Sequence, residues 1–471
     1  RFTIKAREGQ ENSFMQIPKL ITGAALALFS LQALAAVHQV RDGESIQEAV
    51  NGAQPGDTIL VYPGEYIEGV YIDKDGITLR GVVEENEWPT LNGEKKLNDA
   101  ILYSGNDITI EWLKIEYYKG NAIMGQAGNN FVIRYNWVVD TGVYGIFPQY
   151  GQNGLIAYNK LSEIEDAAIY VGMCDNIDVK YNEVFDSVAG IEIENSRHAL
   201  VEANYVHDNT GGILAFITPG LPIKTTFDVI IRNNFVVNNN TPNFGAEGSI
   251  VSMVPAGSGI VIMAADDVRI EGNIITNNNT AGILVSDLSF IGDVSSDPES
   301  EPNPDRLAVL DNFMEGNGHD AVTEVKALSM ATNFTTRGPD IVAVGSAEES
   351  DNCIINRGRY RMIGTSDWSE CDFTSTMDTQ SYLLAGGAAP RSTDGESKAK
   401  LLYRGICAGC HGYDVRLVGP ATVTIQALYG DNAQGIADYI AEPVKKRPDY
   451  PEMPPQSHLP AELRLEVARE L

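Results

Sequence analysis

Apolar and polar residues in the middle of the chain alternate in short runs that recur at a regular interval. From residue 100 to about residue 320, runs such as Phe131 to Arg134 and Ile177 to Lys180 return every 23 residues or so. Alternation over so few residues is typical of a β-strand and not of a helix. A period of this length indicates a solenoid, in which each repeat forms one coil and the strands of successive coils pair.

Two sequence markers keep step with this period. The first is an asparagine after each strand-like run: Asn136, Asn159, Asn182, Asn204, Asn234, Asn273 and Asn312. The second is an isoleucine after a small residue: Ile123, Ile146, Ile169, Ile191, Ile213, Ile260 and Ile283. In coils stacked about 4.8 Å apart, a residue repeated once per coil forms a row along the axis. An asparagine in such a row bonds its own backbone and its copy in the next coil, so we interpret these asparagines as structural.

A row of acidic residues follows the asparagine marker by four positions. Its members, called the acidic row below, are Asp140, Glu163, Asp186 and Asp208, then Asn238, Asn277 and Gly316. Carboxylates stacked about 5 Å apart repel one another unless solvent or a cation lies between them. Calcium binding is one interpretation of this row, and capping of turn N–H groups in solvent is the other.

A second row follows each isoleucine marker by one residue. Its members, called the outer stripe below, are Met124, Phe147, Tyr170, Glu192, Leu214, Val261 and Leu284. If isoleucine points inward, strand alternation makes its neighbour point outward. The outer stripe is therefore either a docking face or a surface covered by a long loop such as Thr218 to Phe227.

Charged residues gather in one part of the repeat. They are Glu192, Glu194, Arg197, His198 and His207. Lyases and epimerases need a base beside a cationic or metal-bound clamp, and this group shows no such constellation. We interpret the group as solvated surface.

The stretch from Asp42 to Gly81 resembles the opening of many right-handed parallel β-helix proteins. Within it, Ser45 and Glu48 form a capping box for a short helix that runs to about Ala53 and would close the open end of the solenoid. The resemblance covers about 300 residues and implies the fold, but this architecture hosts lyases, hydrolases, epimerases, a copper-site maturation factor and pure scaffolds. It therefore implies no single activity.

The first residues have the pattern of a targeting signal. From Met15 to Ala36 the chain has a short basic region, an apolar run and small residues, which is typical of a secretory signal, and residues 1–14 are treated as an upstream extension. The apolar run is shorter than the roughly 20 residues that span a bilayer, so we expect no stable membrane span. The domain boundaries predicted are 37–380 for the β-helix, 381–397 for a flexible linker and 398–471 for a C-terminal domain.

The cysteines before the linker suggest structural roles. Cys353 and Cys371 would form a disulfide in an exported protein and tie down the end of the solenoid. Cys174 lies between coils and is interpreted as a small buried apolar residue.

The C-terminal domain opens with the sequence AKLLYRGICAGCHGYDVRLVGP, in which Cys407, Cys410 and His411 form a Cys-x-x-Cys-His motif. This spacing lets two thiols add to the vinyl groups of a porphyrin while the imidazole reaches the iron. A structural zinc site would need four ligands, and only His458 follows as a further Cys or His. The motif therefore predicts one covalently attached haem c.

The segment 398–471 resembles a class I, monohaem cytochrome c over about 75 residues. The resemblance implies that the carbonyl of Pro420 orients His411, the proximal iron ligand, and that Met453 is the distal ligand. His458 is the competing sixth ligand. A thioether ligand raises the reduction potential, as expected for an electron carrier.

The charge of the chain excludes one class of partner. With 34 basic and 64 acidic residues, the net charge is -30, so nucleic acid and anionic membrane surfaces would be repelled. Haem attachment requires an exported compartment, and the resemblance extends to paired architectures of Gram-negative envelopes. We therefore expect a periplasmic or extracellular protein.

These observations predict an all-β right-handed parallel β-helix solenoid followed by a small all-α cytochrome c domain. The expected function is single-electron transfer with a redox partner protein, with the β-helix used for binding or docking. One alternative is a carbohydrate-active enzyme (lyase, epimerase or oxidising enzyme) that acts on a polysaccharide and passes electrons to the haem. Another is a periplasmic metallocentre-assembly factor, which would need clustered Met, His or Cys on the solenoid, whereas His198, His207 and Cys174 are scattered.

Overall fold

The computed structural model describes residues 35–295, 297–345, 350–383 and 395–471. The predicted upstream extension, almost all of the predicted signal and most of the predicted linker lie outside these residues. Residues 35–471 form one compact unit. Within the described ranges, no helix combines the length and apolar character needed to cross a membrane.

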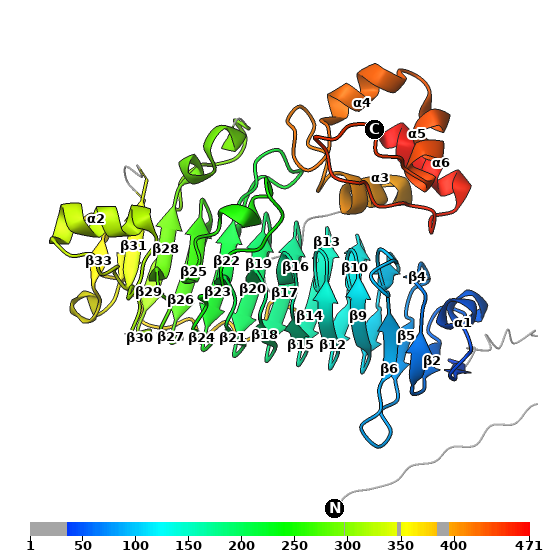
Figure 1. The fold of residues 1–471 in the computed structure, drawn as a ribbon, viewed down its shortest axis with the longest axis horizontal. Helices are drawn as coiled ribbons and strands as arrows, with labels where there is room; N and C mark the ends of the chain where they lie inside the picture. The colour runs from blue at the N-terminus through cyan, green and yellow to red at the C-terminus, as the bar shows by residue number, and fades with distance from the viewer. Residues whose placement is uncertain (1–34, 296, 346–349, 384–394) are drawn as a thin grey trace, which may run out of the picture. The chain divides into compact units, whose positions relative to one another are not determined.

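Three parallel sheets form the walls of a solenoid, and each coil contributes one strand to each sheet (Figure 1). Sheet A contains, in spatial order, β1 (Val37–Val40), β2 (Thr58–Val61), β5 (Thr78–Gly81), β8 (Thr109–Glu111), β11 (Val132–Arg134), β14 (Gln152–Ala157), β17 (Asp175–Lys180), β20 (Arg197–Glu202), β23 (Phe227–Arg232), β26 (Asp266–Glu271), β29 (Ala308–Leu310) and β32 (Cys353–Ile354). Sheet B contains β3 (Gly64–Tyr66), β6 (Pro89–Asn92), β9 (Lys114–Tyr118), β12 (Trp137–Thr141), β15 (Lys160–Ser162), β18 (Glu183–Phe185), β21 (Tyr205–His207), β24 (Phe235–Val237), β27 (Ile274–Thr276) and β30 (Phe313–Glu315). Sheet C contains β4 (Val70–Ile72), β7 (Ile101–Tyr103), β10 (Ile123–Gln126), β13 (Ile146–Gln149), β16 (Ala167–Gly172), β19 (Ala189–Glu194), β22 (Gly211–Phe216), β25 (Ser258–Met263), β28 (Ala281–Ser286), β31 (Ile341–Val344) and β33 (Met362–Ile363). The predicted parallel β-helix is confirmed, and the arrangement is consistent with the right-handed crossovers that parallel strands adopt.

The isoleucine markers form the inner surface of sheet C. Each of them is 0% exposed, and successive members pair directly across neighbouring strands, as in Ile123 with Ile146 and Ile191 with Ile213. Cys174 is also fully buried in this core. Both predictions are confirmed, because strand alternation fixes which side chains face the axis.

The asparagine marker forms a continuous hydrogen-bonded ladder, as predicted. In one step of it, the backbone N–H and side-chain amide of Asn159 both donate to Oδ1 of Asn182, at 3.0 Å each. A second ladder was not foreseen from the sequence. It begins at Ser187 and continues through Asn209, Asn239, Asn278 and Asn317. These amides satisfy buried backbone groups at the corners, where no strand partner is available.

The acidic row lies at a corner where the backbone is left-handed. The φ angles of Asp140, Glu163, Asp186 and Asp208 are between 52° and 62°. Asp and Asn tolerate this conformation better than most residues, which explains their recurrence at the corner without a bound ion. The structure does not test calcium binding, which stays a prediction.

A stack of aromatic rings occupies another left-handed corner and was missed from the sequence. Trp112, Tyr135, Tyr158 and Tyr181 have φ angles near 60°, and successive ring centroids lie 4.8, 5.1 and 4.9 Å apart. Ring stacking offsets part of the conformational cost of a bulky residue in this region.

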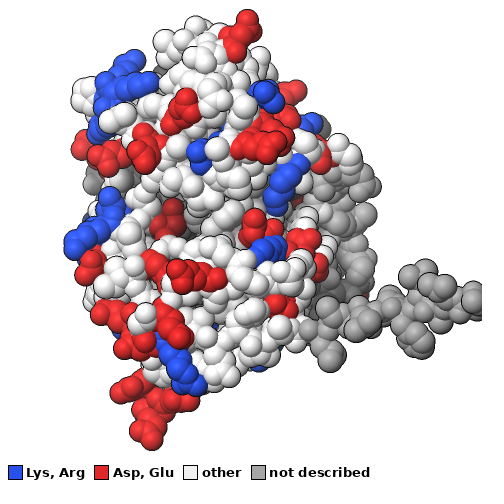
Figure 2. All heavy atoms as spheres, turned by 90° about the vertical axis from the view of Figure 1, so that its right-hand side faces the viewer, with Lys and Arg blue, Asp and Glu red and all other residues white. Residues whose placement is uncertain are grey.

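Helix α1 (Ile46–Gly52) closes the first coil, as predicted. The Ser45 hydroxyl accepts from the N–H of Glu48 at 3.1 Å, and the carboxylate of Glu68 accepts from the N–H of Ile46 at 2.7 Å. Ile46 and Val50 are buried in the solenoid core. Acidic side chains outnumber basic ones on the end of the molecule that contains α1 (Figure 2).

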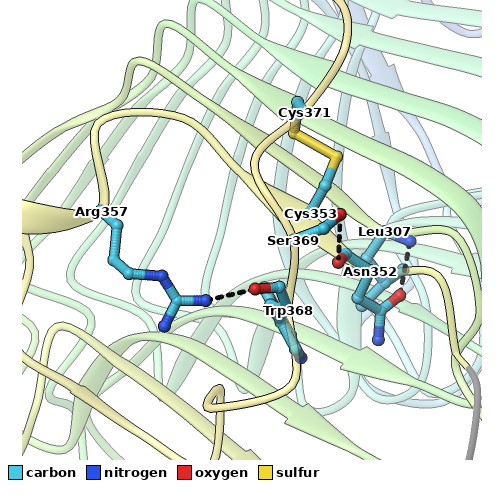
Figure 3. Close-up of a disulfide and its surroundings, with 7 residues drawn as sticks. All are labelled: Leu307, Asn352, Cys353, Arg357, Trp368, Ser369 and Cys371. Atoms are coloured by element: carbon cyan, nitrogen blue, oxygen red, sulfur yellow. Dashed lines mark hydrogen bonds between the residues drawn. A yellow bond between two sulfur atoms is a disulfide. The ribbon is translucent and has the colours of Figure 1, made fainter.

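The last coils contain short helical elements and a disulfide. The helices are η1 (Val251–Met253), η2 (Leu288–Ser295), α2 (Thr323–Asn333) and η3 (Arg357–Arg359). Cys353 in β32 and Cys371 are bonded, with an S–S distance of 2.17 Å, which confirms the predicted pairing (Figure 3). Next to it, the backbone N–H of Ser369 donates to Asn352 O at 2.9 Å and fixes the returning segment on the sheet edge. The Ser369 hydroxyl donates to the same oxygen (Figure 3).

Replacing Cys353 and Cys371 together by alanine should lower the free energy of unfolding by up to about 3 kcal/mol. The two cysteines are 18 residues apart, and without the bond the loop between them gains conformational entropy in the unfolded chain. Urea unfolding under oxidising conditions measures the change. The Cys174→Ala variant, which changes a buried cysteine of the solenoid core, is the control. Equal stability of the double variant and the wild type would contradict a structural role for the bond.

The C-terminal segment is helical. Helix α3 (Lys398–Leu402) continues into the π-helical turn η4 (Tyr403–Cys407), followed by α4 (Thr422–Tyr429), α5 (Ala433–Ala441) and α6 (Ala461–Glu470). Leu402 of α3 and Val467 of α6 are buried together, and Ile440 of α5 packs with Ala468. The predicted small all-α unit is therefore present. Its assignment as a cytochrome c and the exact domain boundaries stay predictions.

Candidate functional site

The Cys-x-x-Cys-His motif forms a tight turn at the end of η4. The backbone N–H groups of Cys410 and His411 both donate to Cys407 O, at 3.1 and 2.9 Å. Neither thiol is in a disulfide; Cys407 is buried and Cys410 is exposed. The turn thus places two free thiols and one imidazole within five consecutive residues.

The ring of His411 is held from one side. Its Nδ1 lies 2.8 Å from the carbonyl oxygen of Pro420, which can only accept, so Nδ1 carries the proton and Nε2 is left as a ligand atom. Gly419 lies against the imidazole, and any Cβ at this position would collide with the ring. Burial lowers the pKa of His411, although the bond to Pro420 opposes this effect, so the ring is neutral at neutral pH. A neutral imidazole fixed in one tautomer fits the role of an axial iron ligand.

Met453 and His458 lie in different surroundings. Met453 packs against Ile436 and Ile440 of α5 within the helical segment. His458 instead contacts the β-helix: its Nε2 lies 3.2 Å from Gln126 Oε1 of β10, and its ring lies 4.7 Å from that of Tyr71. Burial lowers the pKa of His458 to about 4. Of the two candidate sixth ligands, only Met453 keeps its side chain among helical residues.

These donors fit a haem c better than a metal ion alone. Cys407, Cys410, His411 and Met453 supply two thiols, one nitrogen and one thioether. Within the described part of the chain, one group of acidic side chains lies close enough together to share a metal ion, and it is not at this turn. It consists of Asp266, Glu301 and Asp305. The haem ligand assignments themselves stay predictions.

The outer stripe is covered. Its members are at most 8% exposed, and they pack with Tyr144, Ile250, Val254 and Leu328 from the loops and α2. The docking-face interpretation therefore gives way to the covered-surface interpretation, because segments outside the repeat lie over this face.

The prediction of solvated surface is wrong for Glu192, Glu194 and His198, which are buried. Glu192 and Glu194 of β19 are 2% and 7% exposed, and Tyr170 of β16 donates its hydroxyl to Glu194. Asp166, just before β16, lies near both. Burial and the neighbouring negative charges raise the pKa of Asp166 to about 7 and that of Glu192 well above its usual value, and burial raises the pKa of Glu194 to about 7. The name carboxylate cluster is used below for Asp166, Glu192 and Glu194.

The other charged residues of that group lie elsewhere. Arg197 forms a two-point ion pair with Asp175 in sheet A, at 2.7 and 2.8 Å. His198 bonds Asp228 at 2.7 Å at a corner, and His207 of sheet B bonds its neighbour Asp208. The five residues therefore form no single site. Asp166 was missed from the sequence, where it lacks any periodic signal.

The haem-attachment turn lies against sheet C. Any side chain on Gly409 would collide with the amide of Gln149 in β13, so the two segments are in close contact. The charges of the carboxylate cluster and of Cys410 all add to burial in raising the pKa of Tyr144. Tyr144 is thus close to both the turn and the cluster.

Further contacts join the helical segment to the β-helix. Lys398 donates to the backbone of Ser104, and Arg404 donates to the hydroxyl of Tyr150. These bonds, together with that of His458, come from both ends of the helical segment. They hold the Cys-x-x-Cys-His turn against the same face as the carboxylate cluster.

Comparison with known proteins gives one family similarity. Residues 50–249 are similar to the family described as NosD, periplasmic copper-binding protein. This range contains the carboxylate cluster and ends well before the Cys-x-x-Cys-His motif. No curated protein matches the chain.

Solved structures share the coil architecture at low identity. The mannuronan C-5 epimerase AlgE6 A-module of Azotobacter vinelandii is 16% identical with a TM-score of 0.45, covering 70% of this chain and 90% of that one. The alginate lyase of Paenibacillus sp. str. FPU-7 is 15% identical with a TM-score of 0.42, covering 61% and 99%. The DFA-IIIase of Arthrobacter chlorophenolicus A6 is 12% identical with a TM-score of 0.42, covering 72% and 99%. Likeness at this level transfers no activity.

Proposed function

We propose that this chain is an exported electron-transfer protein that binds one haem c in residues 398–471. The supporting observation is the 2.8 Å contact between Nδ1 of His411 and the carbonyl of Pro420, beside two cysteines without disulfide partners. When bound, the haem supplies reversible one-electron transfer at its iron. The family similarity supports a periplasmic location for this function.

The chain's own residues have separable roles in this proposal. Cys407 and Cys410 anchor the porphyrin covalently. His411 presents Nε2 because Pro420 occupies the other ring nitrogen, and Met453 offers its thioether from the side of α5. Helices α5 and α6 pack apolar side chains against Met453.

The β-helix acts in this proposal as a rigid support that sets where electrons enter or leave. Its contacts at Gly409, Lys398 and His458 fix the attachment turn against sheet C. The net charge of -30 favours a redox partner with a basic surface, because opposite charges accelerate encounter.

Replacing Met453 by alanine should lower the haem reduction potential and leave the haem covalently bound, because a thioether ligand favours ferrous iron. Potentiometric titration of the purified protein measures the change. His458→Ala is the matched control and should leave the potential within about 30 mV of wild type, since His458 contacts Gln126. The reverse outcome, with His458→Ala lowering the potential and Met453→Ala leaving it unchanged, would contradict the assignment.

A second candidate function is periplasmic copper binding, favoured by the similarity of residues 50–249 to the NosD family. Copper prefers nitrogen and sulfur donors. Titration of the haem-loaded full chain with Cu²⁺ tests it, with stoichiometric binding as the expected result and no saturable binding as the result that contradicts it. The carbohydrate-active alternative stays a prediction without a specific observation in its favour.

A further inference from the structure

Segments of the same chain cover apolar side chains on the outer faces of sheets A and C. On sheet A, Tyr382 lies across the strands, where its hydroxyl donates to Asp228 of β23 at 2.7 Å. Its ring packs on Leu200 and Ile230, which are both 0% exposed. On sheet C, loops and α2 cover the outer stripe. On both faces the chain therefore shields its outward-facing apolar residues from water.

Sheet B differs, because its outward-facing aromatic side chains stay exposed. The inward-facing residues of this sheet, such as Val206, are 0% exposed, and strand alternation turns their neighbours outward. Tyr205, Phe235 and Phe313 are 44%, 50% and 49% exposed. With Ile274 they form one row, in which each member pairs directly with the next across neighbouring strands.

The aromatic stack at the corner continues this row toward the N-terminal coils. Glu183 of β18 pairs with Tyr205 and is two residues from Tyr181, so the stack and the row are adjacent. The combined set is called the aromatic stripe below and consists of Trp112, Tyr135, Tyr158, Tyr181, Tyr205, Phe235, Ile274 and Phe313. At one strand spacing per coil, the aromatic stripe is about 34 Å long.

The aromatic stripe is as large as the largest apolar patches that monomeric proteins usually expose. A fully exposed aromatic side chain presents about 150–250 Å². The most exposed rings of the stripe are 39–50% exposed, which leaves roughly 550 Å² of aromatic surface in water. A patch of this size marks an interaction site. It supplies most of the roughly 800 Å² that each partner contributes to a stable protein interface.

The charges beside the aromatic stripe are matched in pairs. On sheet B, Lys114 lies 2.5 Å from Glu116, and Lys160 lies 3.2 Å from Glu183. The whole chain, in contrast, has a net charge of -30. Two copies of the chain therefore repel each other least when they approach through this face, because here each carboxylate has a cation beside it.

We propose that the aromatic stripe is the interface of a homodimer, in which it packs on the same stripe of a second copy. A two-fold symmetric interface uses one surface on both copies, and a straight row of side chains matches itself under such a rotation. The side chains of the stripe repeat at the strand spacing, and a second copy has the identical spacing. The rings of one copy can therefore enter the gaps of the other and contact its rings offset or edge to face, as in sheets packed face to face.

The dimer goes beyond the electron-transfer function and does not depend on it. The interface is on sheet B, whereas Gly409 of the haem-attachment turn contacts Gln149 of sheet C. Dimerisation therefore leaves the attachment turn outside the interface.

Sedimentation equilibrium of the haem-loaded full chain tests the proposal. The mass should rise to that of two chains, with half of the chains dimeric at or below about 10 µM. The variant Tyr205→Ser/Phe235→Ser removes two neighbouring rings and should weaken dimerisation by about 100-fold or more. Tyr413→Ser is the matched control, because Tyr413 is 64% exposed in the helical segment, and it should dimerise as the wild type does. Circular dichroism checks that each variant is folded.

Hydroxyl-radical footprinting at low and high protein concentration locates the interface. Tyr158 and Phe235 should become protected as the dimer forms, whereas Tyr413 should not. A chain that stays monomeric up to about 100 µM, or a dimer that persists unchanged in Tyr205→Ser/Phe235→Ser, would overturn the proposal. A monomer whose migration is retarded by a neutral polysaccharide, with the retardation lost in Tyr205→Ser/Phe235→Ser, would overturn it in favour of a glycan at this face.

Discussion

Replacing Cys407 and Cys410 together by serine is expected to remove all covalently bound haem and with it the redox response of the protein. The two thiols lie at the end of η4 without a disulfide partner, and serine cannot form a thioether bond to a porphyrin. After denaturation, the wild type should retain its haem absorbance on the polypeptide, whereas the variant should show none. The expected effect is complete loss, because no other pair of cysteines has this spacing.

The β-helix should remain folded in this variant. Its core is formed by its own coils, and Cys407 belongs to a separate apolar cluster with Leu402 and Val467. Cys174→Ala is the control for loss of a thiol within the solenoid and should keep the full haem content. Covalent haem that persists in the Cys407→Ser/Cys410→Ser variant would refute the electron-transfer proposal.

Replacing Asn182 by alanine is expected to cost about 4 kcal/mol of unfolding free energy. Its Oδ1 accepts from the backbone and the amide of Asn159, and its Nδ2 donates to Ile156 O and to Asn204 Oδ1, each at 3.0 Å. Asn182 is 1% exposed, so water cannot replace these partners. The loss leaves several buried polar groups unsatisfied in two adjacent coils.

Urea unfolding followed by circular dichroism measures this cost. Asn51→Ala is the control, because Asn51 is exposed on α1 and its side-chain oxygen accepts from the side chain of Gln47 at the surface. It should change the unfolding free energy by less than about 0.5 kcal/mol. If Asn182→Ala were as mild as Asn51→Ala, the ladder would contribute little to stability.

The sequence predicted those features that repeat once per coil. Ile123 and its successors face the axis and Asn182 joins a ladder because a coil of fixed length brings equivalent residues into register. The Cys-x-x-Cys-His motif could equally be recognised in the sequence, since its chemistry depends on the spacing of its residues within one turn. Ser187 and the second asparagine ladder were missed although they follow the same period.

Features that depend on segments from outside the repeat could not be predicted. Alternation placed Glu192 on the outer side of its strand, but it did not say whether water would reach that side. Tyr144 lies close to Glu192, and its position follows from a connection outside the strands. His458 is 332 residues away from its partner Gln126, so no local pattern joins them.

The sequence alone thus determined the coil, the inward-facing isoleucines, the asparagine ladder and the covalent-attachment motif, because each is set by local periodicity or short spacing. Only the tertiary structure decided that Glu192 and Glu194 are buried beside Asp166, and that His458 contacts Gln126 of the β-helix. The physical reason is that burial and charge compensation depend on which distant segments meet, and these contacts have no period.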